Sequence, residues 1–128
     1  MFVLLRETLV MKLNEIEFGS ARPIEGYGPG FFRIGGEVWP GSLLVWEKGA
    51  AAWDGFADRG SLLALSNEID VVFVGTGTEI APLPKDFRDT LEKAGLGVEA
   101  MNSPSACRTY NVLLSEGRRI AAALLPVD

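Results

Sequence analysis

The densest group of potentially reactive side chains lies in residues 102–111, with the sequence NSPSACRTYN. It includes the single cysteine of the chain, Cys107, followed by Arg108. A thiol in the first turns of a helix, beside a guanidinium, has a lowered pKa and can act as a nucleophile. The chain contains no histidine to act as its base. The alternative interpretation is a small residue packed in the core.

A second group, Gly75-Thr76-Gly77-Thr78, directly follows the apolar run 71–74. Open α/β sheets place their ligand crevice at such a strand end. Glycines let backbone amides approach an anion closely, and threonine hydroxyls can add donors. However, the next helix is expected only near Pro84, and no complete phosphate-loop or dinucleotide motif is present. The alternative is a tight strand exit that needs glycine for positive φ.

Both groups follow an expected strand, so they could meet at one edge of a parallel sheet. The sequence therefore predicts a candidate site for an anionic metabolite, with a thiol-dependent enzyme at the same cleft as a further alternative. The candidate ligand-binding residues are Gly75, Thr76, Gly77, Ser103, Cys107, Arg108 and Asn111. No catalytic residue, metal ligand or cofactor is assigned.

Composition excludes several classes of function. The chain has 128 residues, 48% hydrophobic and 23% charged, as expected for one globular domain. Twelve basic against 17 acidic residues give a net charge of −5, so a nucleic-acid partner is not expected. One cysteine and no histidine exclude an internal disulfide, a His-ligated zinc site and a Ser-His-Asp triad.

The first half of the chain predicts antiparallel sheet. Residues 31–34 and 37–39 flank Gly35-Gly36, a pair typical of a tight β-hairpin. A turn at Pro40-Gly41 then leads into residues 42–46, and the three runs together predict a meander. Upstream, the glycine-dense residues 26–30 are interpreted as a loop.

The second half predicts alternating strands and helices. The expected elements are a short helix at 62–67 capped by Ser61, a strand at 71–74, a helix from Pro84 to Gly95, a strand at 97–101, a helix capped by Ser103 that runs to Gly117, and a strand at 118–126. Short joints between these elements imply parallel, right-handed βαβ units. The predicted fold class is α/β, a single three-layer domain (residues 11–128) with a central mixed sheet and an N-terminal antiparallel meander.

Arginines and aromatic residues offer two weaker candidates. Arg108, Arg118 and Arg119 are close in sequence, but neighbouring strand residues face opposite ways, so ion pairs with acids are the favoured interpretation. Large aromatic residues could form a partner-binding patch; the alternative is that they join two layers of the fold. These aromatics are Phe31, Phe32, Trp39, Trp46 and Trp53.

The N-terminal residues contain no segment long and apolar enough to span a bilayer or to form a signal-peptide core. The expected location is therefore the cytoplasm, without membrane insertion. Met11 opens MKLNEI, a natural start, so residues 1–10 are predicted to be an N-terminal extension.

Three segments together carry a resemblance: GYGPGFFRIGGEVWPGSLLVW, the strand with VGTG, and EAMNSPSACRTYNVLLSEGRRIAAALLP. They resemble the family of mitochondrial NADH dehydrogenase (complex I) assembly factor 3, which includes the adipogenesis-associated Mth-type domain protein and bacterial members of unknown function. The resemblance spans residues 11–127. It implies a three-layer α/β fold, a protein partner rather than an established reaction, and no catalytic residues to transfer. The leading prediction is a bacterial, non-enzymatic assembly-factor-like protein that aids a respiratory or membrane complex; the oligomeric state is left open.

Overall fold

The computed structural model describes residues 3–4 and 22–128. Its smaller sheet has four antiparallel strands in the order β1-β2-β3-β4. These strands are β1 (Val3–Leu4), β2 (Gly26–Gly28), β3 (Phe31–Ile34) and β4 (Glu37–Pro40). The predicted hairpin at Gly35-Gly36 is confirmed, since both glycines have positive φ between the paired strands β3 and β4.

The larger sheet has five strands in the order β6-β5-β9-β7-β8. They are β5 (Leu43–Trp46), β6 (Gly49–Ala52), β7 (Val71–Thr76), β8 (Gly97–Met101) and β9 (Ile120–Leu125). Strand β7 lies between β8 and β9 and runs parallel to both, whereas β5 runs antiparallel to β6 and β9. The predicted α/β fold with a central mixed sheet is confirmed.

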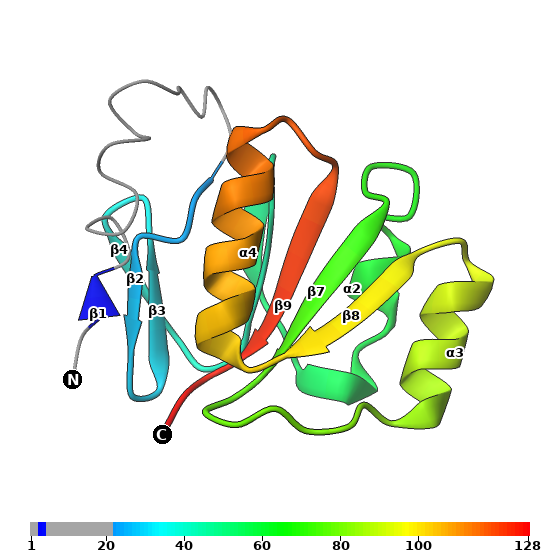
Figure 1. Ribbon diagram of the computed structural model, residues 1–128, viewed down its shortest axis with the longest axis horizontal. Helices are drawn as coiled ribbons and strands as arrows, with labels where there is room; N and C mark the ends of the chain where they lie inside the picture. Colours follow the sequence, from blue (N-terminus) through cyan, green and yellow to red (C-terminus); the bar gives the residue numbers. More distant parts are fainter. Residues whose placement is uncertain (1–2, 5–21) are drawn as a thin grey trace.

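Helices cover both faces of this sheet. The chain contains η1 (Gly55–Ala57), α2 (Gly60–Leu63), α3 (Lys85–Lys93) and α4 (Ser103–Ser115). Helix α4 lies across one face with the small sheet beside it, and α2 and α3 lie on the other face (Figure 1). From β7 to β8 the chain moves toward one edge of the sheet, and from β8 to β9 it moves back past β7. Because both βαβ connections are right-handed, this reversal places α3 and α4 on opposite faces.

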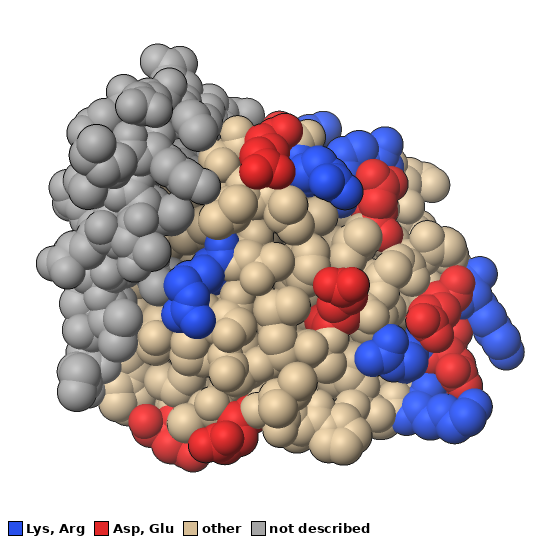
Figure 2. All heavy atoms as spheres, viewed as in Figure 1, with Lys and Arg blue, Asp and Glu red and all other residues tan. Residues whose placement is uncertain are grey.

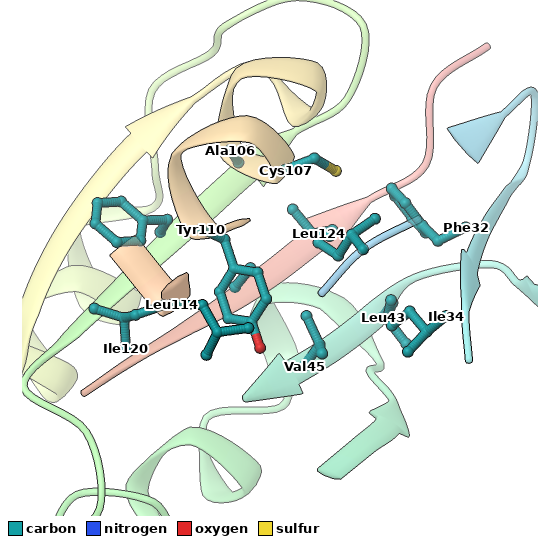
Figure 3. Close-up of a cluster of buried hydrophobic side chains, with 13 residues drawn as sticks. Phe32, Ile34, Leu43, Val45, Ala106, Cys107, Tyr110, Leu114, Ile120 and Leu124 are labelled. Carbon is teal, nitrogen blue, oxygen red and sulfur yellow. The ribbon is translucent and has the colours of Figure 1, made fainter. Parts of the chain in front are cut away.

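Two apolar clusters fill the spaces between the layers. The first lies between α4, the small sheet and one face of the large sheet, and includes Phe32, Tyr110 and Leu124 (Figure 3). The second lies under α2 and α3 and includes Trp53, Leu62 and Phe87. Strands β7 and β9 contribute alternate side chains to both clusters, which is why their sequences are almost continuously apolar.

The predicted three-strand meander is wrong in one respect. Strand β5 leaves the small sheet and pairs with β9, about 80 residues later in the chain, and with β6. The change of sheet occurs at Gly41, which has a φ of 81° and donates its N–H to Gly30 O at 2.8 Å. Residues 26–28, interpreted as loop, form β2, and β6 was not predicted.

Two helix caps also differ from prediction. The first short helix begins at Gly60, and the side chain accepting hydrogen bonds there is Asp58, not Ser61; its carboxylate accepts from Ser61 N and from Ser61 Oγ. The cap of α4 is Asn102, whose Oδ1 accepts from Ser105 N at 2.8 Å, and Ser103 is already inside the helix. In both cases a longer amide or carboxylate one to three residues earlier reaches the free amides.

The predicted extension, residues 1–10, lies outside the described residues except for β1, which pairs with β2. A start at Met11 stays a prediction. No helix within the described ranges is long and apolar enough to cross a bilayer.

Candidate functional site

The two candidate segments meet at one edge of the large sheet, where β7, β8 and β9 end. Ser103, at the start of α4, donates its N–H to Gly77 O at 2.8 Å. Its hydroxyl accepts from Gly77 N at 2.9 Å and donates to Leu125 O at 2.5 Å. Ser103 is fully buried. A single side chain therefore joins the ends of β7 and β9 to the first turn of α4.

The two glycines of residues 75–78 have different roles. Gly77 follows β7 directly and has a φ of +98°, a backbone conformation that is unfavourable for residues with a side chain. This conformation explains why a glycine occupies the strand exit. Gly75 lies within β7 with ordinary φ, but a Cβ there would lie 2.7 Å from Ser103 Oγ and 2.9 Å from Ser103 Cα. Gly75 therefore allows α4 to pack closely against the strand, and both Gly75 and Thr76 belong to the strand rather than the loop.

Thr76 organises the loop that follows. Its hydroxyl donates to Glu79 O at 2.7 Å and accepts from Ala81 N at 3.0 Å. Thr78 Oγ1 accepts from Asp128 N at 3.0 Å, which attaches the C-terminal residue to the same loop. The loop's threonine hydroxyls thus bind the chain's own backbone.

Cys107 and Asn111 lie away from this edge, on the side of α4 that faces the small sheet. Cys107 is fully buried in the first cluster, and Figure 3 shows its sulfur on the side of α4 toward Phe32 of β3. Burial raises the pKa of the thiol, and the positive charge of Arg108 only partly opposes this effect. The pattern is opposite to that of a nucleophilic cysteine.

Asn111 is 1% exposed, and its side chain forms two hydrogen bonds with the chain before β2. Its Oδ1 accepts from Ile24 N at 2.7 Å and its Nδ2 donates to Ile24 O at 2.8 Å. The preceding residue, Tyr110, donates its hydroxyl to Arg22 O at 3.1 Å. These side chains attach the segment leading into the small sheet to α4.

The arginines are spread over the surface. Arg108 is exposed and contacts Ser105 Oγ at 3.3 Å. Arg119 donates to Asn67 O at 2.8 Å, and its Nη2 lies 3.7 Å from Asp70 Oδ1. Within the described residues the ion-pair interpretation is confirmed for Arg119 but not for Arg108 or Arg118. In the view of Figure 2, charged side chains of both signs gather around the rim, and the surface over α4 carries few of them.

The five aromatic residues do not form one patch. Phe31, Phe32 and Trp39 belong to the small sheet, and the last two pack in the first cluster. Trp46 and Trp53 pack in the second cluster. Trp53 also donates its indole N–H to Asp58 O at 3.0 Å. The large apolar side chains exposed in the described residues are instead Val38, 56% exposed, and Ile80, 65% exposed. Sequence reasoning missed both, because an isolated apolar residue in a loop or edge strand has no periodicity.

One hollow lies near the opposite ends of the strands. It has a volume of about 250 Å³ and is lined by Trp46, Glu47, Lys48, Asn67, Glu68, Ile69, Arg119 and Ile120. Its lining mixes acidic and basic groups. Among residues 3–4 and 22–128, no three His, Cys, Asp or Glu side chains are placed to hold a metal ion.

Comparison with known proteins shows the family of this chain. Residues 24–125, which include both sheets' main strands and α4, match a family described as a protein of unknown function, DUF498/DUF598. The chain belongs to the DUF498/DUF598 family. An uncharacterized protein of Rhodobacter capsulatus is 50% identical over 117 residues, or 91% of this chain and 94% of that protein.

The resemblance to complex I assembly factor 3 is also confirmed. NADH dehydrogenase (ubiquinone) 1 alpha subcomplex assembly factor 3 of Danio rerio is 32% identical over 128 residues, covering 94% of this chain and 73% of the fish protein. This chain therefore shares sequence with assembly factor 3 along nearly its whole length.

Solved structures share the fold. A crystal structure of an outer membrane protein from Bartonella henselae has a TM-score of 0.78 and 33% identity, covering 85% of this chain and 98% of that one. A solution structure from Bordetella pertussis, a Mth938-like domain, has a TM-score of 0.69 and 27% identity, covering 82% and 85%. The DUF498/DUF598 chain thus has a Mth938-like fold.

Proposed function

We propose that this chain is a non-enzymatic, protein-binding assembly factor that aids the formation of a respiratory or other membrane-associated complex. The observation that carries the proposal is the 32% identity with assembly factor 3 over 94% of the chain. The 50% identical relative is bacterial, which fits action in a bacterial cell; we place that action in the cytoplasm.

The state of the candidate residues supports a binding role over catalysis. The thiol is buried with a raised pKa, and the amide of Gly77 and the hydroxyl of Ser103 bind each other. Groups used in this way hold the fold together. The groups that remain free to bind a partner are side chains on the outer surface. In protein recognition, a few exposed side chains held in place by a rigid backbone contribute most of the binding energy.

Ile80 is the anchor that we assign to partner binding. It is 65% exposed at the tip of a loop that Thr76 braces through hydrogen bonds to the residues on either side of it, Glu79 and Ala81. A braced loop loses little conformational entropy on binding. Val38, 56% exposed on β4, offers a matched apolar control at a distance from this loop.

The test is deletion of the gene in its native host, followed by native gel analysis of the respiratory complexes. We expect loss of fully assembled NADH dehydrogenase, or of another membrane complex, and accumulation of subcomplexes. The wild-type gene and Val38→Asp should restore assembly, whereas Ile80→Asp should not, with both variants folded by circular dichroism. Unchanged amounts of every membrane complex in the deletion strain would overturn the proposal.

A second candidate function is binding of an anionic metabolite at the edge formed by Gly75, Thr76, Gly77 and Ser103. It is favoured by one observation, the convergence of these residues where three strands end. Binding would require the anion to replace hydrogen bonds that the chain makes with itself. A thermal-shift series with phosphates, nucleotides and carboxylates tests it, since a ligand at 100 times its Kd adds about 2.7 kcal/mol to stability. No shift with any anion would exclude this function.

A further inference from the structure

Among residues 3–4 and 22–128, no strand pairs with the outer edge of β6. Strand β6 is the first strand of the large sheet and is paired on one side, with β5. A two-residue turn, Glu47-Lys48, joins the strands, so the closing pair Trp46 and Gly49 exchanges both hydrogen bonds. The Trp53 N–H bond to Ser42 O continues the same alternation. Ala50 and Ala52 therefore direct their N–H and C=O groups away from the sheet.

This edge also lacks the usual protection against pairing. Its residues, Gly49–Ala52, are small and uncharged, and Ala52 is exposed. By contrast, the opposite edge strand β8 has its Val98 carbonyl bonded to Arg88 Nη1 at 3.0 Å and carries the exposed Glu99. Proteins commonly block sheet edges with charges or prolines. Within the described part of the chain, the β6 edge is therefore available to another strand.

The charged residues on either side of β6 indicate which strand could pair with its outer edge. Lys48 precedes β6 and Asp54 follows it by two residues. Both are exposed, and neither has an ion-pair partner in the described part of the chain. An antiparallel strand of the same sequence would bring each of these charges opposite its complement. The arrangement is complementary to itself.

We propose that β6 pairs antiparallel with β6 of a second copy of this chain, joining the two large sheets into one across a two-fold axis. In the register that we assign, Ala51 lies opposite Ala51, Ala50 opposite Ala52, and Lys48 opposite Asp54 of the second copy. This register lets the outward groups of Ala50 and Ala52 exchange hydrogen bonds. A shift by two residues would instead place Lys48 opposite Ala52 and lose both ion pairs.

The interface is small, because four residues with small side chains form its centre. We therefore expect a weak dimer whose population depends on protein concentration. Sedimentation velocity from about 10 μM to about 1 mM covers the range of such affinities. We expect the dimer fraction to rise over this range for the full chain. A monomer at the highest concentration would overturn the proposal.

Charge reversal tests the assigned pairs. Lys48→Glu and Asp54→Lys each place like charges opposite one another, and each should weaken the dimer about three- to tenfold. An equimolar mixture of the two variants restores opposite charges and should form a heterodimer at wild-type strength. Lys93→Glu, on the exposed end of α3, is the matched control and should change nothing. A dimer that is unaffected by both Lys48→Glu and Asp54→Lys uses another surface and overturns the proposal.

Cross-linking tests the register. Opposed residues in a non-hydrogen-bonded antiparallel pair have Cα atoms about 4.5 Å apart, within the range of a disulfide. Ala51→Cys should therefore form a covalent dimer on mild oxidation, and Ala50→Cys should form much less, because its partner is Ala52. The buried Cys107 does not compete. Equal cross-linking by both variants, or none by either, contradicts the register.

Discussion

The side-chain amide of Asn111 forms two hydrogen bonds with the backbone of Ile24, 2.7 Å and 2.8 Å long. The two residues are 87 positions apart, and both are almost fully buried. The amide thus satisfies the N–H and the C=O of a chain segment that enters the small sheet. This contact connects the small sheet to α4 by directional bonds in addition to apolar packing.

Replacing Asn111 by leucine keeps the branched shape and the number of side-chain heavy atoms but removes both hydrogen bonds. The N–H and C=O of Ile24 would then be buried without partners, at about 1–3 kcal/mol for each group. We expect Asn111→Leu to lower the free energy of unfolding by about 3 kcal/mol, measured by urea denaturation. Asn67→Ala, at an exposed position, should stay within about 0.5 kcal/mol of wild type. Equal stability of the two variants would contradict the role of Asn111.

Gly75 offers a test of the close approach between β7 and α4. A methyl group there would lie within 3 Å of Ser103 Oγ, Ser103 Cα and Leu124 Cδ2, so Gly75→Ala should cost about 1–3 kcal/mol. Ser103→Ala removes one of these three contacts, and the double variant should be less destabilised than the sum of the two single variants. Gly60→Ala, with open space around it, is the control in the same thermal melts. Simple additivity would mean that Ser103 Oγ is not the obstacle.

Much of the fold could be predicted because the second half of the chain has strong local signals. The apolar run at β7, the Gly97–Met101 strand and the proline in the first turn of α4 each specify an element by composition or stereochemistry. Strands β2 and β6 lack such signals, since glycine and alanine have no β preference. Each becomes a strand by pairing with the strand next to it in the sequence, β3 for β2 and β5 for β6.

The candidate site was predicted less well, and α4 shows why. Its buried residues recur every three or four positions, a stripe that marks the side of a helix facing the core. That stripe consists of Ser103, Ala106, Cys107, Tyr110, Asn111 and Leu114. Residue types suggested chemistry at Cys107 and Asn111, but their helical spacing with Tyr110 and Leu114 indicated burial. The proximity of Gly77 and Ser103 could be predicted, because each lies just after a parallel strand of the same sheet. The hydrogen bonds between them could not be foreseen from the sequence.

Asp58 gives a prediction with a defined pH dependence. Hydrogen bonds from the Ser61 hydroxyl and the Ser61 amide lower the pKa of its carboxyl group. The stability from the ionised form is therefore present above the unfolded pKa, about 3.9, and is lost as pH falls through the lower folded value. Asp58→Ala should cost about 1 kcal/mol at pH 7, and the difference from wild type should shrink toward pH 3. A difference independent of pH would contradict this assignment.

Cys107 should make the protein less stable at high pH. Burial raises the pKa of its thiol in the folded state, while in the unfolded chain the thiol titrates near 8.5. Below pH 8.5 both states hold the proton and the group has no effect on stability. Above it only the unfolded chain loses the proton, so the free energy of unfolding should fall by up to about 1.4 kcal/mol for each pH unit. Denaturation of wild type and Cys107→Ala from pH 7 to 10 measures the difference, and iodoacetamide should alkylate the native thiol far more slowly than the unfolded one. A wild-type slope equal to that of the variant, or fast native alkylation, would show that this thiol is accessible to solvent.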